Sequence, residues 1–223
     1  MRRTRLAVLA ALAATFAVAV TGCGGGSSSS SPEQLPATPG QSKASLFGDP
    51  ALFVLDETDL PDGYQLDPPN TRAITNADTA RGRDDAYLRN IKSMGRISGY
   101  ASGWRLTKAE QAGPIQIESS VSTYETGGGA VDAYALALTE ISPAYKRVAD
   151  VDTVGDESRA WKRPLDGANG PLVIHTIAWR SGQVIGVLAT TSQAGTDSID
   201  DALAYAQKQQ QRIAATAAKA LGK

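Results

Sequence analysis

Two apolar runs separated by a Ser-Gly pair form the strongest secondary-structure signal in the chain. Residues 172–180 are apolar at most positions, Ser181 and Gly182 follow, and residues 183–191 are again largely apolar. Two such runs joined by a short turn that contains glycine are typical of a β-hairpin. Because both faces of the first run are apolar, we expect it to be a central strand of a sheet, covered on both sides.

Further strand and helix patterns surround this hairpin. Period-two or short apolar runs predict strands at 51–55, 96–106, 115–124 and 158–162. The runs at 96–106 and 115–124 are expected to pair as a second hairpin, joined through Gly113-Pro114. Helical spacing of apolar residues predicts helices at 84–94, 130–138 and 198–221. The predicted fold class is α+β, an antiparallel sheet of about five or six strands with two or three helices packed on it, including a long C-terminal helix.

The C-terminal helix carries two kinds of surface. Apolar residues at helical spacing form one stripe, which is expected to pack on the sheet. Residues 207–212 in its middle are polar all round. We expect this polar stretch to face solvent.

The first residues have the three parts of a secretory signal: a cationic head, an apolar run over 6–20 and small residues before Cys23. Fifteen apolar helical residues rise only about 22 Å, less than the roughly 30 Å of a membrane core, so a permanent transmembrane helix is disfavoured. The stretch Val20-Thr21-Gly22-Cys23 resembles the lipobox of bacterial lipoproteins. That resemblance implies a signal peptide at 1–22 and lipidation of Cys23, which becomes the first mature residue.

Composition after the leader limits the chemistry and the partners. Residues 23–47 are rich in Gly, Ser and Pro and are expected to be a tether, with one extracytoplasmic α+β domain at 48–223. Removing 1–22 takes three of the 22 Lys and Arg and none of the 23 Asp and Glu, so 19 minus 23 leaves a net charge of −4. This acidic balance argues against a nucleic-acid partner. Cys23 is the only cysteine, so once it is lipidated no disulfide or thiolate site can form.

A second resemblance rests on the order of several short motifs. Residues 60–64 (Leu-Pro-Asp-Gly-Tyr), a helix after Thr126, residues 154–157 (Val-Gly-Asp-Glu), a hairpin over 174–191 and a terminal helix follow one another. The arrangement is similar to many uncharacterised bacterial lipoproteins, to secreted sensor-like domains such as those outside bacterial serine/threonine kinases, and to the PsbP-like α/β sandwich. It implies a fold, and fold alone does not imply function.

Few residues suggest chemistry. His175 is the only histidine and there is no Gly-x-Ser-x-Gly elbow, so no catalytic residue is predicted. The acids of the turn over 56–62 favour a solvated loop over a metal site, and neither a metal nor a cofactor is expected. Because aromatic groups bind apolar or sugar faces, the candidates for ligand contact are Trp104, Trp161, Trp179, Tyr64, Tyr87 and Tyr100. Of these, Trp104, Trp179 and Tyr100, together with His175, are the predicted ligand contacts. The alternative that these residues fill the core stays open.

These observations favour a binding function outside the cell. We expect a lipid-anchored, sensor-like module on the outer face of a bacterial cell membrane, or on its periplasmic side, that binds a small molecule, a wall component or a protein. Its partners would be the membrane, through lipid on Cys23, and an unknown ligand or envelope protein. The alternative is a structural envelope lipoprotein that acts through protein contacts, and a hydrolase comes third.

Overall fold

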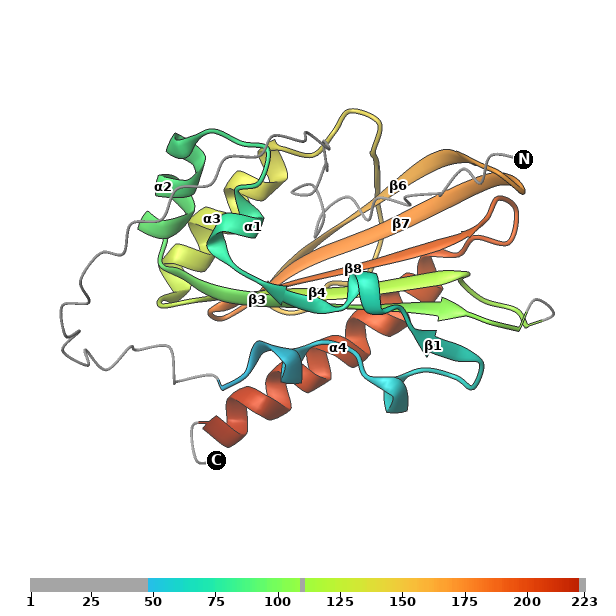
Figure 1. Ribbon diagram of the computed structural model, residues 1–223, viewed down its shortest axis with the longest axis horizontal. Helices are drawn as coiled ribbons and strands as arrows, with labels where there is room; N and C mark the ends of the chain where they lie inside the picture. The colour runs from blue at the N-terminus through green and yellow to red at the C-terminus, as the bar shows by residue number, and fades with distance from the viewer. Residues whose placement is uncertain (1–47, 109–110, 221–223) are drawn as a thin grey trace, which may run out of the picture.

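One antiparallel sheet organises the fold (Figure 1). The computed structural model describes residues 48–108 and 111–220. Within these ranges the sheet has eight strands, in the order β1-β3-β4-β8-β7-β6-β5, and β2 pairs with β3 on the same edge as β1. The long strands are β3 (Arg96–Leu106), β4 (Gln116–Tyr124), β6 (Glu157–Gly167), β7 (Gly170–Ser181) and β8 (Val184–Gln193). The short strands are β1 (Tyr64–Leu66), β2 (Arg72–Ile74) and β5 (Lys146–Val148).

Both predicted hairpins are confirmed. Strands β7 and β8 pair from Ser181 opposite Val184 outward, and β3 pairs with β4 from Arg105 opposite Gln116. The hairpin of β7 and β8 lies at the centre of the sheet, between β6 and β4. This position explains why both faces of β7 are apolar, because elements pack on each side of it.

The α+β class is confirmed, but the predicted strand number of five or six was too low. The additional strands are short: β1, β2 and β5 have three residues each and lie at the edges of the sheet. Strands of this length carry too few residues to show an alternating pattern. The described residues also contain four α-helices instead of two or three, because α1 (Asn76–Thr79) forms a single capped turn.

One face of the sheet, called here the α4 face, is covered by α4 (Ile199–Ala220) and by the 3-10 turn η2 (Pro50–Phe53). The main core lies between them, with Phe53, Leu55, Ile177, Trp179 and Leu188 almost completely buried. The strand predicted at 51–55 was wrong: Pro50 fixes the first residue of the turn and the Asp49 carboxylate accepts a hydrogen bond from the Ala51 amide. The apolar residues of this run are nevertheless in the core, as their composition indicated.

The polar middle of α4 faces solvent only in part: Gln207, Lys208 and Gln211 are exposed as predicted, whereas the other three residues turn toward the protein. Gln209 is completely buried and its amide donates to the Ser120 carbonyl at 3.0 Å. Gln210 accepts from the Trp179 indole at 2.8 Å. Arg212 forms ion pairs with Asp56 and Asp59, at each end of the 3-10 turn η3 (Glu57–Asp59). Gln209, Gln210 and Arg212 each bind a donor, an acceptor or a charged group of another element. Hydropathy patterns do not reveal such pairings.

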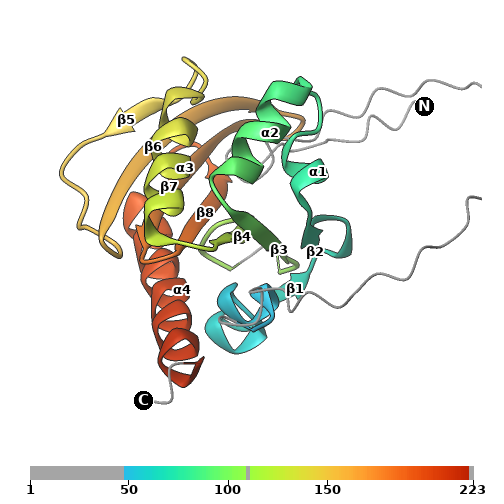
Figure 2. The ribbon, with the colours of Figure 1, turned by 90° about the vertical axis from the view of Figure 1, so that its left-hand side faces the viewer.

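The opposite face, called here the α3 face, carries the other helices. These are α1, α2 (Asp85–Ser93) and α3 (Gly127–Thr139), and they cover one end of the sheet (Figure 1). The end-on view shows β6 and β7 arching over the side that bears these helices (Figure 2). A second, smaller core joins Ala133 and Tyr134 of α3 to Ala178 and Ile185 of the sheet.

The leader, Cys23 and the tether lie outside the described residues, so the predicted boundaries at 22 and 47 stay predictions. None of the helices in the described ranges is long and apolar enough to cross a membrane.

Candidate functional site

Four side chains form a line across the α3 face at one level of the sheet. Glu118 of β4 pairs with Ala189 of β8, Ala189 pairs with Thr176 of β7, and Thr176 pairs with Trp161 of β6. Neighbouring strands lie about 4.8 Å apart, so the line is about 14 Å long from Glu118 to Trp161. We call Glu118, Ala189, Thr176 and Trp161 the inner row. It combines an acid, a small residue, a hydroxyl and an aromatic ring on a rigid platform.

Cavities lie on both sides of the inner row. On the side of the helices, a mostly apolar cavity of about 90 Å³ is bounded by Ser120, Val187 and Ala178, each two residues from a member of the row. On the other side, a cavity of about 320 Å³ is bounded by Arg105 and Gln116 and by the loop at 167–169. The second volume is within the range of small-molecule sites. The two cavities lie beyond opposite sides of the row, and its four members line neither of them.

The acidic end of the row is built by a close approach of backbone at Gly103, which pairs with Glu118. A Cβ atom at Gly103 would lie 2.7 Å from the Asn70 Cβ, so only glycine admits the 3-10 turn η4 (Pro68–Asn70) against β3. This turn brings the buried Asp67 close to Glu118. Asp67 accepts from Asn70 at 2.6 Å and from Arg105 Nε at 2.8 Å.

Glu118 has an unusual environment for a carboxyl group. Its Oε1 accepts a hydrogen bond from Gln116 Nε2 at 2.5 Å. Burial, together with the negative charge of Asp67, raises the pKa of Glu118 to about 7, against the opposing effect of Arg105. A carboxyl group of this kind can donate or accept a hydrogen bond near neutral pH. It can also favour a bound cation by losing its proton.

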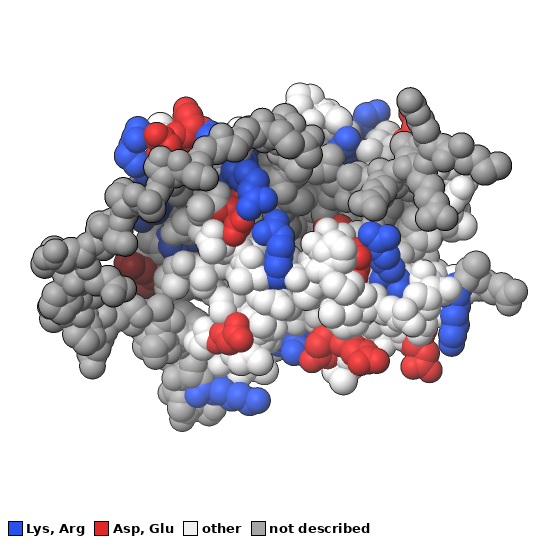
Figure 3. Space-filling model, viewed as in Figure 1, with Lys and Arg blue, Asp and Glu red and all other residues white. Residues whose placement is uncertain are grey.

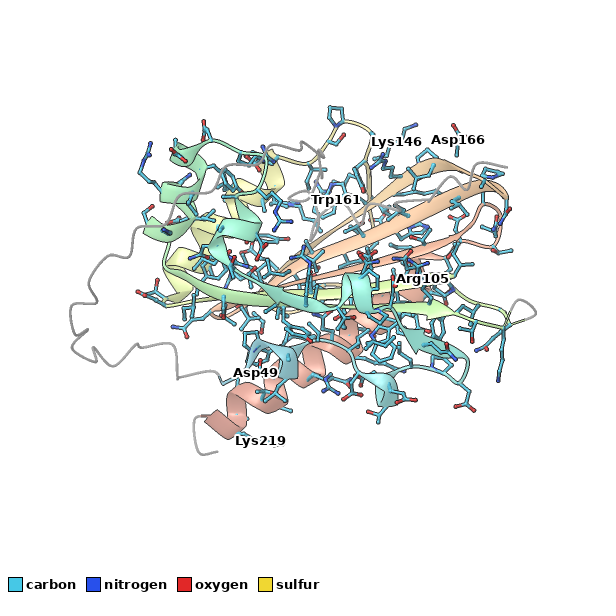
Figure 4. All side chains as sticks on the ribbon, in the orientation of Figure 1. Asp49, Arg105, Lys146, Trp161, Asp166 and Lys219 are labelled. Atoms are coloured by element: carbon cyan, nitrogen blue, oxygen red, sulfur yellow. The ribbon has the colours of Figure 1, made fainter. Side chains whose placement is uncertain are left out.

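The opposite end of the row is formed by Tyr145 and Arg163. Tyr145 directly precedes β5 and lies on the α3 face, where its ring is 5.3 Å from the Arg163 guanidinium carbon. Burial raises the pKa of the Tyr145 hydroxyl, the neighbouring Arg163 opposes the rise by its hydrogen bond and its charge, and the Glu118 charge adds a smaller contribution to the rise. In Figure 4 the labelled Trp161 and Arg105 mark the β6 side and the β3 side of this face.

Two buried hydroxyl groups at the row can form further hydrogen bonds. The Thr176 hydroxyl forms none within the described part of the chain, and the Arg163 guanidinium that interacts with the Tyr145 hydroxyl can only donate to it, which leaves the hydroxyl hydrogen without an acceptor there. A buried polar group without a partner costs about 1–3 kcal/mol, so natural proteins rarely keep one without a reason. Binding of a polar molecule would supply the missing hydrogen bonds.

The residues predicted from the sequence to contact a ligand lie on the other face. Trp104, Trp179, Tyr100 and His175 all point to the α4 face by strand register. Trp179 is completely buried, and the Trp104 indole donates to the Ser102 hydroxyl at 3.3 Å. Their position is that of core residues, the alternative left open by the sequence, and ligand contact by them stays a prediction.

His175 participates in a polar cluster at the start of α4. Its Nε2 lies 2.9 Å from Asp197 Oδ2, which also accepts from Lys162 Nζ at 2.8 Å. Lys162, with a further contribution from His175, holds the pKa of Asp197 well below its usual range. No serine hydroxyl bonds to the imidazole within the ranges described. The cluster is suited to fixing the chain that leads into α4.

The acids of the turn over 56–62 have structural partners. Asp56 and Asp59 form a reciprocal capping box around η3 and both bind Arg212. In the part of the chain that the structure describes, no three His, Cys, Asp or Glu residues are grouped so as to hold a metal ion. Figure 3 shows positive and negative side chains interspersed over one face of the molecule.

Sequence reasoning named Trp161 among the aromatic candidates but missed Glu118, Thr176 and Ala189, and it did not consider the second face of β4. The alternation of 117, 119 and 121 indicated one buried face, and that face packs under α4 as expected. The polar residues between them, Gln116, Glu118 and Ser120, were the available signal. Only the curvature of the sheet shows that this second face is also enclosed.

Comparisons with known proteins identify no family. No family model matches the chain, and no curated protein matches it. Among solved structures, the chain is similar to the extracellular domain of PknH from Mycobacterium tuberculosis, with 12% identity and a TM-score of 0.48 over 74% of this chain and 94% of that chain.

Proposed function

We propose that this protein is a non-catalytic binding module that holds a small polar molecule at the inner row, outside the cell, and is anchored by lipid on Cys23. The observation that carries the binding function is the inner row itself. It places a partly buried carboxyl group, an aromatic ring, the Thr176 hydroxyl without a partner and the Tyr145 hydroxyl with a hydrogen to donate on one face of the sheet, with a cavity beyond each side of the row. Such a combination of apolar surface with a few convergent polar groups is characteristic of ligand sites.

Binding is favoured over hydrolysis by the positions of the ionisable groups. His175 lies on the opposite face of the sheet from the inner row. Asp67 is the second carboxylate near Glu118, but it is 6% exposed and holds Asn70 and Arg105. Hydrolysis by two carboxyl groups requires both to face the substrate, and Asp67 is committed to its turn.

A purely structural role through protein contacts has less support. The exposed large apolar side chains in the described ranges are Leu52, Leu66 and Val131, and they lie on η2, β1 and α3. Protein interfaces usually show a contiguous apolar patch, which three side chains on separate elements do not make.

Two matched variants test the binding function. Thr176→Val removes a hydroxyl without a partner from the inner row, and Thr190→Val removes one from the α4 face. The purified protein is titrated by calorimetry with diglycine, N-acetylglucosamine and citrate, which represent a zwitterion, a neutral sugar and an anion. We expect at least one probe to bind, Thr176→Val to weaken its binding, and Thr190→Val to leave it unchanged. Binding that is equal in all three proteins, or no binding by any probe, contradicts the proposal.

The anchor is tested separately. Cys23→Ala should abolish acylation and release the protein from the membrane fraction, whereas Ser27→Ala in the adjacent serine run should change neither. Retention of the cysteine variant in the membrane with an unchanged mass would contradict the anchor and would leave the binding site unaffected.

A further inference from the structure

The two ends of the inner row carry opposite charge. At one end are Glu118 and Asp67. At the other end, three arginines surround Trp161 on the α3 face. Arg147 of β5 pairs with Trp161, and Arg159 and Arg163 precede and follow it by two residues along β6. Along the row, the α3 face therefore carries acidic groups at the Glu118 end and basic groups at the Trp161 end.

The basic end has charge available for a ligand. Ion pairs of the described residues join Arg105 to Asp67 and Arg180 to Asp156 and Glu157, but none involves Arg147, Arg159 or Arg163. Arg163 lies over the Tyr145 ring, so a carboxylate bound to its guanidinium could also accept from the Tyr145 hydroxyl. An anionic group at this position would gain two kinds of donor.

The cation at the acidic end, Arg105, is paired with Asp67, and Glu118 has no ion pair of its own among the described residues. Arg105, the nearest arginine, donates to Asp67, and Glu118 receives a neutral amide from Gln116. A protonated amine beside Glu118 would add a charge-assisted hydrogen bond and would offset the repulsion between Glu118 and Asp67. The site is better completed at this end by a cation than by another anion.

The length of the row limits the size of a molecule that can reach both ends. The row spans about 14 Å between backbones, and side chains reach inward from each end. An extended peptide of two or three residues is about 7–10 Å long. Ala189 has the smallest side chain of the row and lies between Glu118 and Thr176, so the body of such a molecule would pass over it.

We infer that the ligand of the inner row is a short zwitterion of peptide type, with its amino group at Glu118 and its carboxylate at Arg163 and Tyr145. This inference rests on the proposed binding function and adds the chemical class of the ligand. It predicts that both charged ends of the molecule are recognised and that the distance between them matters.

A graded set of ligands tests the class. Glycine, diglycine and triglycine vary the distance between the charges, N-acetyl-diglycine lacks the cation, and diglycine amide lacks the carboxylate. Calorimetric titration should show tightest binding for diglycine or triglycine, with blocking of either end weakening it by about tenfold or more. Equal binding of the blocked and free forms would overturn the inference.

Two variants connect each end to its residue. Glu118→Gln should remove the preference for a free amine, and Arg163→Gln should remove the preference for a free carboxylate. Lys146→Gln is the matched control, because Lys146 is an exposed cation on β5, next to Arg147 in sequence but on the other face. If N-acetylglucosamine or citrate binds in a Thr176-dependent manner while no oligoglycine does, the class is wrong and the binding function stands. If no probe binds, both proposals fail.

Discussion

Replacing Glu118 with glutamine should make the stability of the protein less dependent on pH. Burial and the Asp67 charge raise the pKa of Glu118 from its ordinary value of 4.5 to about 7 in the folded protein. The folded protein therefore binds a proton more tightly than the unfolded chain does. This effect stabilises the fold below pH 4.5 and is lost as the pH rises through 7. At about 1.4 kcal/mol per pH unit, the loss is about 3 kcal/mol.

Glutamine resembles the protonated carboxyl group and stays neutral at every pH. We therefore expect Glu118→Gln to be close to wild type in stability at pH 4 and up to about 3 kcal/mol more stable at pH 8. Urea unfolding followed by tryptophan fluorescence at pH 4, 6 and 8 measures both proteins. Because the other groups titrate in both, the difference between the two curves isolates Glu118.

The control is Glu57→Gln, the same substitution at an exposed glutamate. Its stability should follow that of wild type at each pH. The reasoning is refuted if Glu118→Gln and wild type differ by the same amount at all three pH values, or if the variant is less stable at pH 8.

Three further substitutions test other parts of the structure. Thr176→Val should raise the free energy of unfolding by about 1 kcal/mol or more, because it removes a buried hydroxyl without a partner. A loss of stability in urea unfolding would show instead that this hydroxyl forms a hydrogen bond in the folded protein. Gly186→Ala should lower the free energy of unfolding by about 1–3 kcal/mol, because a Cβ atom at this position would collide with the Trp179 ring. A melting temperature unchanged from wild type would contradict this packing. Asp197→Asn should destabilise the protein at neutral pH, where the depressed pKa of Asp197 contributes stability, and the difference should begin to shrink as the pH falls below about 4. A difference that is as large at pH 2 as at pH 7 would contradict the ionic role of this residue.

The parts of the fold that the sequence predicted are those with a long periodic signal. The hairpin of β7 and β8, the pairing of β3 with β4 and the long helix α4 each repeat one pattern over nine or more residues. The three-residue strands depend on neighbours that are distant in sequence, such as β5 on β6, and local patterns do not show them.

The candidate site was harder to predict for a related reason. Trp179 and Trp161 are both tryptophans in long strands, and only the register shows that Trp179 lies in the core under α4 and Trp161 lies in the inner row on the α3 face. Glu118 and Thr176 are 58 positions apart in sequence, and each is unremarkable in its own strand. They lie at the same level of the sheet because β8 lies between β4 and β7, and its Ala189 pairs with Glu118 on one side and with Thr176 on the other.

The inner row as the binding surface is tested most directly by a residue-resolved NMR titration. Diglycine, N-acetylglucosamine and citrate are added in turn to the isotope-labelled protein, and the shifts of the backbone amides are followed. The account predicts that a probe that binds shifts the amides of Glu118, Thr176, Trp161 and Ala189 and leaves those around Trp104 and His175 largely in place. Shifts that are centred on the α4 face, or the absence of any shift with all three probes, would contradict it.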